Sequence, residues 1–146
     1  MSLQGNNIPV FATNPQNSGG TLAAATAGSL GSNTNGVTLY TAGSNGSRVY
    51  GLFLSTNDVA NSVFLYIYNG STAFPIGFIA VPATAGDLAN TPCVDALSPA
   101  NCPGLPFDGT GKPYVELATG CTLKMAAFAN VTAAKSIFGS SMGADY

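Results

Sequence analysis

The chain has 146 residues, of which only 7% are charged, and its four Lys and Arg, six Asp and Glu and no His give a formal net charge of −2. An ordinary soluble domain has about 25% charged residues, so the polar surface here must consist mainly of uncharged side chains. Binding of nucleic acid requires clustered cations. The four cations are scattered along the chain, so no nucleic-acid partner is expected.

The length fits a single domain with a core of its own. No run of about 18 apolar residues occurs, so we expect no transmembrane helix and no membrane partner. The first residues lack a basic region followed by an apolar one, so we expect no secretory signal. A surface with so few charges guards poorly against association, which indicates a protein that works inside an assembly.

Residues 1–36 differ in composition from the rest of the chain. They are rich in Gly, Ser, Asn and Ala, which is typical of a flexible linker. We interpret residues 1–36 as an extended N-terminal arm and residues 37–146 as one β-sandwich domain. The arm would lie on a neighbouring subunit; the alternative is that it covers the chain's own sheet. The apolar anchors of the arm would be Ile8, Val10, Phe11, Leu22 and Leu30.

Residues 48–81 have the clearest strand pattern. Three short runs, rich in β-branched and aromatic residues and separated by turn residues, predict three antiparallel strands at 48–55, 62–68 and 74–81. The dipeptide Asn69-Gly70 favours a hairpin with a type I′ turn, because that turn needs positive φ at both central positions.

Further strands are expected on both sides of this region. They are predicted at residues 37–42, 93–97, 114–118, 122–129 and 135–140, with a hairpin-type turn at 43–47. Proline residues limit the strand at 93–97 to a short one, and no segment has a sustained helical period. About eight strands at spacings of about 10 residues predict an all-β fold. We expect a single antiparallel β-sandwich, with a jelly roll as the leading topology.

The strand at 62–68 is apolar on both faces, and this is the main functional signal of the sequence. Its residues Val63, Leu65 and Ile67 are expected to cover the core, so the alternate aromatic residues point outward. The next strand should add two more aromatic residues on the same side. This outward set is Phe64, Tyr66, Tyr68, Phe74 and Phe78.

Aromatic residues on a surface with few charges are typical of the core of a protein–protein interface. The alternative is that the chain's own arm and loops cover both faces. Because the strand at 62–68 is apolar on both faces and the chain has few charges, we expect a homo-oligomer, either a dimer or a trimer.

Three cysteines occur, without a Cys-x-x-Cys spacing and without any His, so no metal site is expected. Cys93 and Cys102 share one Pro-rich loop and could form a disulfide under oxidising conditions; the alternative is that all three cysteines are reduced. Cys121 is expected to be a buried thiol on a strand.

Catalytic residues are not evident in the sequence. The usual hydrolytic triads require His, and the six acidic residues show no close pair. Residues 108–112 (DGTGK) fail as a phosphate loop because Pro113 follows them and no helix opens there. They also lack the alternating acids of a calcium loop, so we interpret them as a Gly-rich turn. Enzyme activity and cofactors are not expected.

Four segments have a recognisable combination of turn and strand patterns: residues 38–49 (TLYTAGSNGSRV), 76–82 (IGFIAVP), 111–114 (GKPY) and 143–146 (GADY). Together they resemble tailed-bacteriophage capsid decoration, or cement, proteins. The resemblance covers residues 38–146 and implies a β-sandwich or jelly roll without catalytic residues. It further implies a virion protein, assembled in the host cytoplasm, that binds the major capsid protein on the outer surface of the head. The Pro-rich insertion at 91–106 departs from this pattern.

Two functions are therefore compatible with the sequence. The first is a structural virion protein that decorates and stabilises (cements) a bacteriophage capsid by binding across major capsid protein subunits. The alternative is a phage tail or fibre β-sandwich module that binds host-surface glycans. A glycan binder should have exposed aromatic residues ringed by acids, amides or a metal site in its loops. Here the aromatic residues lie on strands and the acids are dispersed, which favours the first function.

Overall fold

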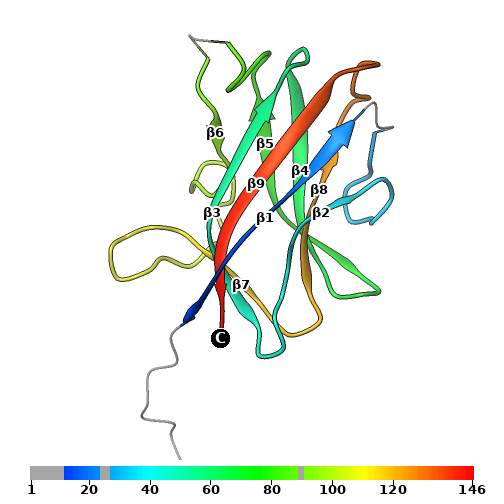
Figure 1. The fold of residues 1–146 in the computed structure, drawn as a ribbon. Coiled ribbons are helices and arrows are strands. Elements are labelled where there is room, and N and C mark those ends of the chain that lie inside the picture. Colours follow the sequence, from blue (N-terminus) through cyan, green and yellow to red (C-terminus); the bar gives the residue numbers. More distant parts are fainter. Residues whose placement is uncertain (1–11, 24–26, 89–90) are drawn as a thin grey trace, which may run out of the picture.

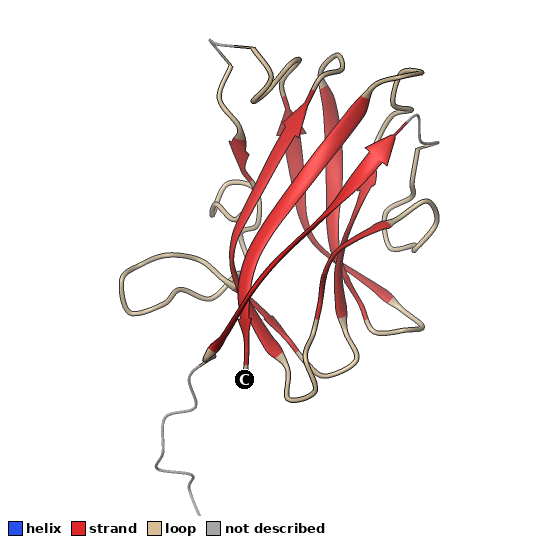
Figure 2. Ribbon diagram, in the orientation of Figure 1, coloured by secondary structure: helices blue, strands red, loops and turns tan. Residues whose placement is uncertain are grey.

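The computed structural model describes residues 12–23, 27–88 and 91–146. Figure 2 shows only strands as regular elements, and within the described residues no helix could cross a membrane. The nine strands of this described part are β1 (Asn14–Ala23), β2 (Val37–Thr41), β3 (Ser47–Thr56), β4 (Asn61–Tyr68), β5 (Ala73–Val81), β6 (Val94–Asp95), β7 (Val115–Leu117), β8 (Thr122–Ala127) and β9 (Ser136–Asp145).

Two antiparallel sheets pack face to face, so the predicted β-sandwich is confirmed (Figure 1). One sheet has the order β1-β9-β3-β6, with β7 also pairing with β3, and the other has the order β2-β8-β4-β5. The pairs are nested along the chain: β1 with β9, β2 with β8, β3 with β7, and β4 with β5. This nesting is the strand arrangement of a jelly roll.

The core lies between the two sheets and follows the period of two along each strand. Leu52 and Leu54 of β3 face Val63 and Leu65 of β4 across it, and Met125 of β8 is also fully buried. Burying a side chain of this size contributes about 1.5–3 kcal/mol relative to leaving it exposed. The same alternation fixes which residues lie on the outer face of each sheet.

The order of the strands along the chain does not give their pairing. β4 pairs with β5 as predicted, whereas β3 lies in the other sheet and pairs with β9, β7 and β6. The expected hairpin at residues 43–47 is wrong, because β2 pairs with β8. The turn residues mark where the chain reverses, but in a jelly roll such a reversal can carry the chain from one sheet to the other.

The β4–β5 connection lies where the sequence places it, but the expected type I′ turn is wrong. The loop consists of residues 69–72, and Gly70 has a φ of 95° while Asn69 keeps a negative φ. The Asn69 Oδ1 accepts hydrogen bonds from the backbone amides of Ser71 and Thr72, at 3.0 and 2.8 Å. Asn69 therefore closes the loop through the hydrogen bonds of its side chain, and its own backbone does not take the left-handed conformation that a type I′ turn requires.

Part of the expected N-terminal arm is a strand of the chain's own sandwich. β1 pairs with β9 along its whole length, and Leu22 is fully buried in the core. The interpretation of residues 14–23 as an arm on a neighbouring subunit is therefore wrong, and the sandwich begins before residue 37. Gly20 of β1 allows β1 to approach β2 closely, because a Cβ on Gly20 would clash with the carbonyl oxygen of Thr38 on β2.

The other anchors proposed for the arm remain predictions. Leu30 is exposed in the loop that follows β1. Ile8, Val10 and Phe11 lie outside the described residues.

The Pro-rich region contains one short strand, β6, as predicted, and its loop supports the core. Cys102 is buried beneath Gly77, and its Sγ lies 3.4 Å from the carbonyl oxygen of Ala96. Cys93 is exposed, and all three cysteines are free thiols in this structure; a Cys93–Cys102 disulfide under oxidising conditions stays a prediction. Cys121 is only partly buried and precedes β8, so its expected place on a strand is wrong.

Candidate protein-interaction surface

The outer face of the β2-β8-β4-β5 sheet has a group of three phenylalanine rings, Phe64, Phe78 and Phe128, here called the aromatic cluster. The ring centroids of Phe64 and Phe78 are 5.2 Å apart, and Phe128 lies 5.9 and 5.8 Å from those two rings. Each ring contacts both others in a tilted or edge-to-face arrangement, which the quadrupoles of aromatic rings favour.

Strand register brings the three rings together. Phe64 of β4 lies directly opposite Phe78 of β5, and directly opposed side chains on one face are in contact range. Phe128 follows the last residue of β8, and its backbone amide donates a hydrogen bond to the carbonyl oxygen of Ser62 at 2.8 Å. This hydrogen bond extends the β4–β8 ladder by one residue, so Phe128 continues the outward row of β8.

The cluster is open to solvent at two of its three rings. Phe78 is 49% exposed and Phe128 is 58% exposed, while Phe64 beneath them is only 9% exposed. Isolated apolar residues on a surface are common, but a contiguous apolar patch marks an interaction site. Phe64 thus serves as the floor of a small apolar surface that Phe78 and Phe128 present to solvent.

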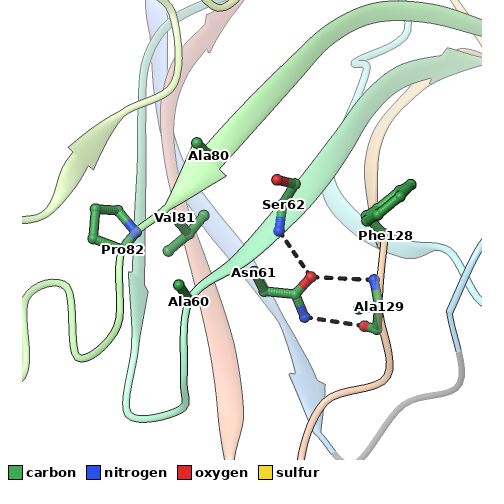
Figure 3. Close-up of a pocket in the computed structure, with 8 residues that line it drawn as sticks. All are labelled: Ala60, Asn61, Ser62, Ala80, Val81, Pro82, Phe128 and Ala129. Carbon is green, nitrogen blue, oxygen red and sulfur yellow. Dashed lines mark hydrogen bonds between the residues drawn. The ribbon is translucent and has the colours of Figure 1, made fainter.

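A shallow hollow of about 450 Å³ adjoins Phe128 (Figure 3). It is lined mainly by apolar atoms from the start of β4, the end of β5 and the end of β8: Ala60, Asn61, Ser62, Ala80, Val81, Pro82, Phe128 and Ala129.

The Asn61 side chain of this hollow is already engaged within the chain. Asn61 Oδ1 accepts hydrogen bonds from the amides of Ser62 and Ala129, and Asn61 Nδ2 donates to the carbonyl oxygen of Ala129 (Figure 3). The hollow therefore presents mainly apolar surface, with the Asn61 side chain turned to partners within the chain.

The other half of the same sheet face is covered by the chain itself, so Tyr66 is not an exposed anchor. Tyr66 is 2% exposed and its hydroxyl donates a hydrogen bond to Asn33 Oδ1 at 3.0 Å. Burial raises the pKa of the Tyr66 hydroxyl. The segment that covers Tyr66 is the loop of residues 27–36, here called the covering loop. The Gly28 amide fixes the start of this loop by donating a hydrogen bond to the carbonyl oxygen of Ala127 on β8.

Tyr68 lies at the margin of the covered half and is partly buried. The Lys124 Nζ lies 5.0 Å from the centroid of the Tyr68 ring and donates a hydrogen bond to Asn33 Oδ1 at 3.0 Å. The covering loop is therefore fixed by Asn33, which accepts hydrogen bonds from both Lys124 and Tyr66. The alternative that the chain's own arm and loops cover the aromatic residues therefore holds for Tyr66 but not for Phe78.

Phe74 lies on the opposite side of its strand from Phe78, contrary to the prediction. The pairing of β4 with β5 runs from Leu65↔Gly77 to Tyr66↔Pro75 and skips Ile76. This extra residue is a β-bulge, which reverses the alternation beyond it. Phe74 consequently pairs with Ile67, which packs on the core side, although Phe74 itself is exposed at the sheet edge.

Phe128 was missing from the predicted outward set, although the sequence contains a signal for it. If Leu123, Met125 and Ala127 point inward, strict alternation places Phe128 outward, and Leu123 and Met125 are indeed fully buried. What the alternation cannot show is that β8 runs beside β4, which brings Phe128 to Phe64.

A metal site has no candidate among the described residues. Among them no group of three or more His, Cys, Asp and Glu could hold a metal ion, and every buried side-chain polar atom has a hydrogen-bond partner. Residues 108–112 form the expected turn, in which the Asp108 carboxylate accepts hydrogen bonds from the Thr110 and Lys112 amides. These hydrogen bonds lower the pKa of Asp108.

Comparison with known proteins gives little further information. No family model matches the sequence, and no curated protein matches it. The chain is similar to a chain of the solved cyanophage Pam1 capsid asymmetric unit, with a TM-score of 0.42 and 16% sequence identity over 100% of this chain and 97% of that chain. A similarity at this TM-score supports no conclusion about the function of the protein.

Proposed function

We propose that this chain is a structural virion protein that decorates and stabilises a bacteriophage capsid. It binds the major capsid protein on the outer surface of the head, across the boundaries between capsid subunits, and it has no enzymatic role. The observation that carries this proposal is the aromatic cluster, whose Phe78 and Phe128 rings are exposed on a sheet face. The resemblance of residues 38–146 to capsid decoration proteins supports the class of partner.

The physical basis of attachment is the burial of apolar surface. Removing apolar surface from water contributes about 25 cal/mol per Å², and Phe78, Phe128 and the adjoining hollow provide such surface. No Lys or Arg contributes to the aromatic cluster or the hollow. Attachment should therefore tolerate salt, unlike a contact that depends on exposed ion pairs.

The glycan-binding alternative has less support from the geometry. Sugar recognition needs free hydrogen-bonding groups beside an aromatic ring, and the side-chain amide that lines the hollow beside Phe128, that of Asn61, is already bonded to Ser62 and Ala129. The hollow has the composition of a contact for an apolar side chain of a protein.

The proposal is tested by adding the purified protein to heads that lack it, at low and at high salt. The measurements are the occupancy of the heads and the temperature at which they open. We expect saturable binding at both salt concentrations and a higher opening temperature in the decorated heads. Heads that neither bind the protein nor gain thermal stability would show that the cement function is wrong.

A further inference from the structure

The opposite face of the sandwich, the outer face of the β1-β9-β3 sheet, has a second apolar surface. Phe138 and Met142 of β9 alternate with buried residues and point outward. Tyr50 and Phe53 are exposed on β3, which is paired with β9 (Figure 1). We call these four side chains the β3–β9 stripe. The aromatic cluster does not include any of them.

Strand register and one glycine bring Met142 and Phe53 of this stripe together. Gly51 pairs with Met142, and a Cβ built on Gly51 would lie 3.2 Å from Met142 Cε and 3.8 Å from Phe53 Cε2. The Met142 side chain therefore lies over the bare backbone of Gly51, next to the Phe53 ring. Aromatic residues and Met are enriched in the cores of protein–protein interfaces.

The end of the stripe next to β7 has two opposite charges. The Arg48 Nε donates a hydrogen bond to Glu116 Oε2 at 3.3 Å, and both side chains remain partly exposed. The Arg48 guanidinium lies 4.0 Å from the centroid of the Tyr114 ring, which helps to hold it on this face. At the edge of the sheet, Asp95 of β6 accepts a hydrogen bond from the amide of Leu97.

We propose that this face binds a second copy of the chain in a two-fold symmetric dimer. A two-fold contact places the same patch on both subunits, so the patch must be complementary to itself. The neighbouring Arg48 and Glu116 meet this requirement, because Arg48 of one copy can pair with Glu116 of the other. A patch of a single sign would repel its own copy.

The apolar part of the stripe supplies the contact area, and the two charges set the register of the two copies. The proposal does not rest on attachment to a capsid, because the aromatic cluster lies on the opposite face of the sandwich. A dimer built in this way leaves both aromatic clusters free.

The test measures the mass of the full chain by sedimentation velocity from low micromolar to several hundred micromolar protein. We expect a reversible monomer–dimer equilibrium. The double substitution Phe53→Thr/Phe138→Thr removes two rings that are 39% and 40% exposed and keeps β-branched residues suited to strands. It should weaken dimerisation by more than about tenfold. The matched control, Phe78→Thr, removes a ring from the opposite face and should leave dimerisation unchanged.

Charge reversal gives a second readout that leaves the apolar stripe intact. Arg48→Glu and Glu116→Arg should each dimerise more weakly than the wild type, because like charges then meet across the two-fold axis. A mixture of the two variants should form a heterodimer, since one variant presents only acids and the other only cations at these positions. Thermal unfolding of each variant checks that it is folded.

A wild-type chain that stays monomeric, or that forms a trimer, would overturn the proposal. So would a dimer that survives the Phe53→Thr/Phe138→Thr substitution or is lost in Phe78→Thr. If the double variant does not fold, the mixing experiment decides, and a mixture that forms no heterodimer overturns the proposal.

Discussion

The rings of Phe78 and Phe128 meet edge to face, with centroids 5.8 Å apart, although β5 and β8 are separated by β4. Phe64 of β4 lies between them and contacts both rings. Each such aromatic pair contributes about 0.5–1.5 kcal/mol beyond its buried area. The two exposed rings are therefore held in place before any partner binds, which lowers the entropy lost on binding.

The substitution Tyr66→Phe should lower the stability of the sandwich without changing its exposed surface. It removes the hydrogen bond from the Tyr66 hydroxyl to Asn33, and a net loss of about 0.5–1.5 kcal/mol is expected for a bond of this kind. Denaturant unfolding measures the change. Because the ring is buried, attachment to heads should remain; a folded variant that loses attachment would show that Tyr66 contacts the partner directly.

The substitution Gly36→Ala should be destabilising because the added methyl group would overlap the Tyr66 hydroxyl. Forcing extra volume into a packed site costs about 1–3 kcal/mol. The matched control is Gly104→Ala, where nothing lies within 4 Å of the added Cβ, so the free energy of unfolding should change by less than about 1 kcal/mol. Thermal unfolding compares the two variants, and equal effects would contradict the packing of residues 27–36 on β4.

Most of the fold could be predicted from the sequence, because the eight strands β2–β9 each overlap a segment predicted from its apolar residues and the turn residues beside it. β1 could not, because its composition of Asn, Ser and Gly is that of a linker. What makes it a strand is its ladder with β9 and the buried Leu22, and neither depends on the local composition. The pairing of a segment's backbone with a distant strand cannot be recognised from the amino acids of that segment alone.

The candidate site could be predicted only in part. The outward direction of Phe64 and Phe78 follows from simple alternation, and both belong to the aromatic cluster. The placement of Phe74 fails because a single extra residue, Ile76, reverses the alternation. The burial of Tyr66 depends on a loop that is distant in sequence, so no pattern along β4 could have shown it.

Stability should fall at acid pH through Asp58. Its carboxylate accepts hydrogen bonds from the amides of Thr132 and Val59, both at 2.8 Å. The hydrogen bonds from Thr132 are the main cause that lowers the pKa of Asp58 in the folded state, and the charge of Lys135 adds to it. A depressed folded pKa means that this contribution is present above the ordinary pKa of Asp, about 3.9, and is lost as the pH falls through the lower folded value.

Asp58→Asn should therefore lower the melting temperature at neutral pH and flatten its decline at acid pH. An amide offers one acceptor oxygen to two donors on opposite sides, so one of them would lose its partner. Asp108 also has a lowered pKa. The melting temperature of Asp108→Asn at acid pH is therefore measured beside that of Asp58→Asn for comparison. A melting temperature of Asp58→Asn that equals the wild-type value at pH 7 would contradict this role.

The three thiols should react in order of exposure. Cys93 is exposed, whereas Cys102 is buried, and burial, with the nearby charge of Asp95, raises the pKa of the Cys102 thiol to about 11. The thiolate is the reactive form, so an alkylating reagent at neutral pH should modify Cys93 first and Cys102 only after unfolding. Peptide mass mapping over time measures the order. Equally fast modification of Cys102 in the folded protein would contradict its burial.

The central claim, that the aromatic cluster is the contact with the capsid, is tested most directly by the occupancy of heads by Phe78→Ala and Phe128→Ala. Each variant should lose binding free energy on the order of 1–4 kcal/mol if these rings are the anchors of the contact. The control is Phe107→Ala, which removes a ring that is 53% exposed but lies in a loop away from the cluster. The account predicts heads that are occupied by Phe107→Ala as by the wild type and are depleted of the two cluster variants. Equal occupancy by all four proteins would contradict it.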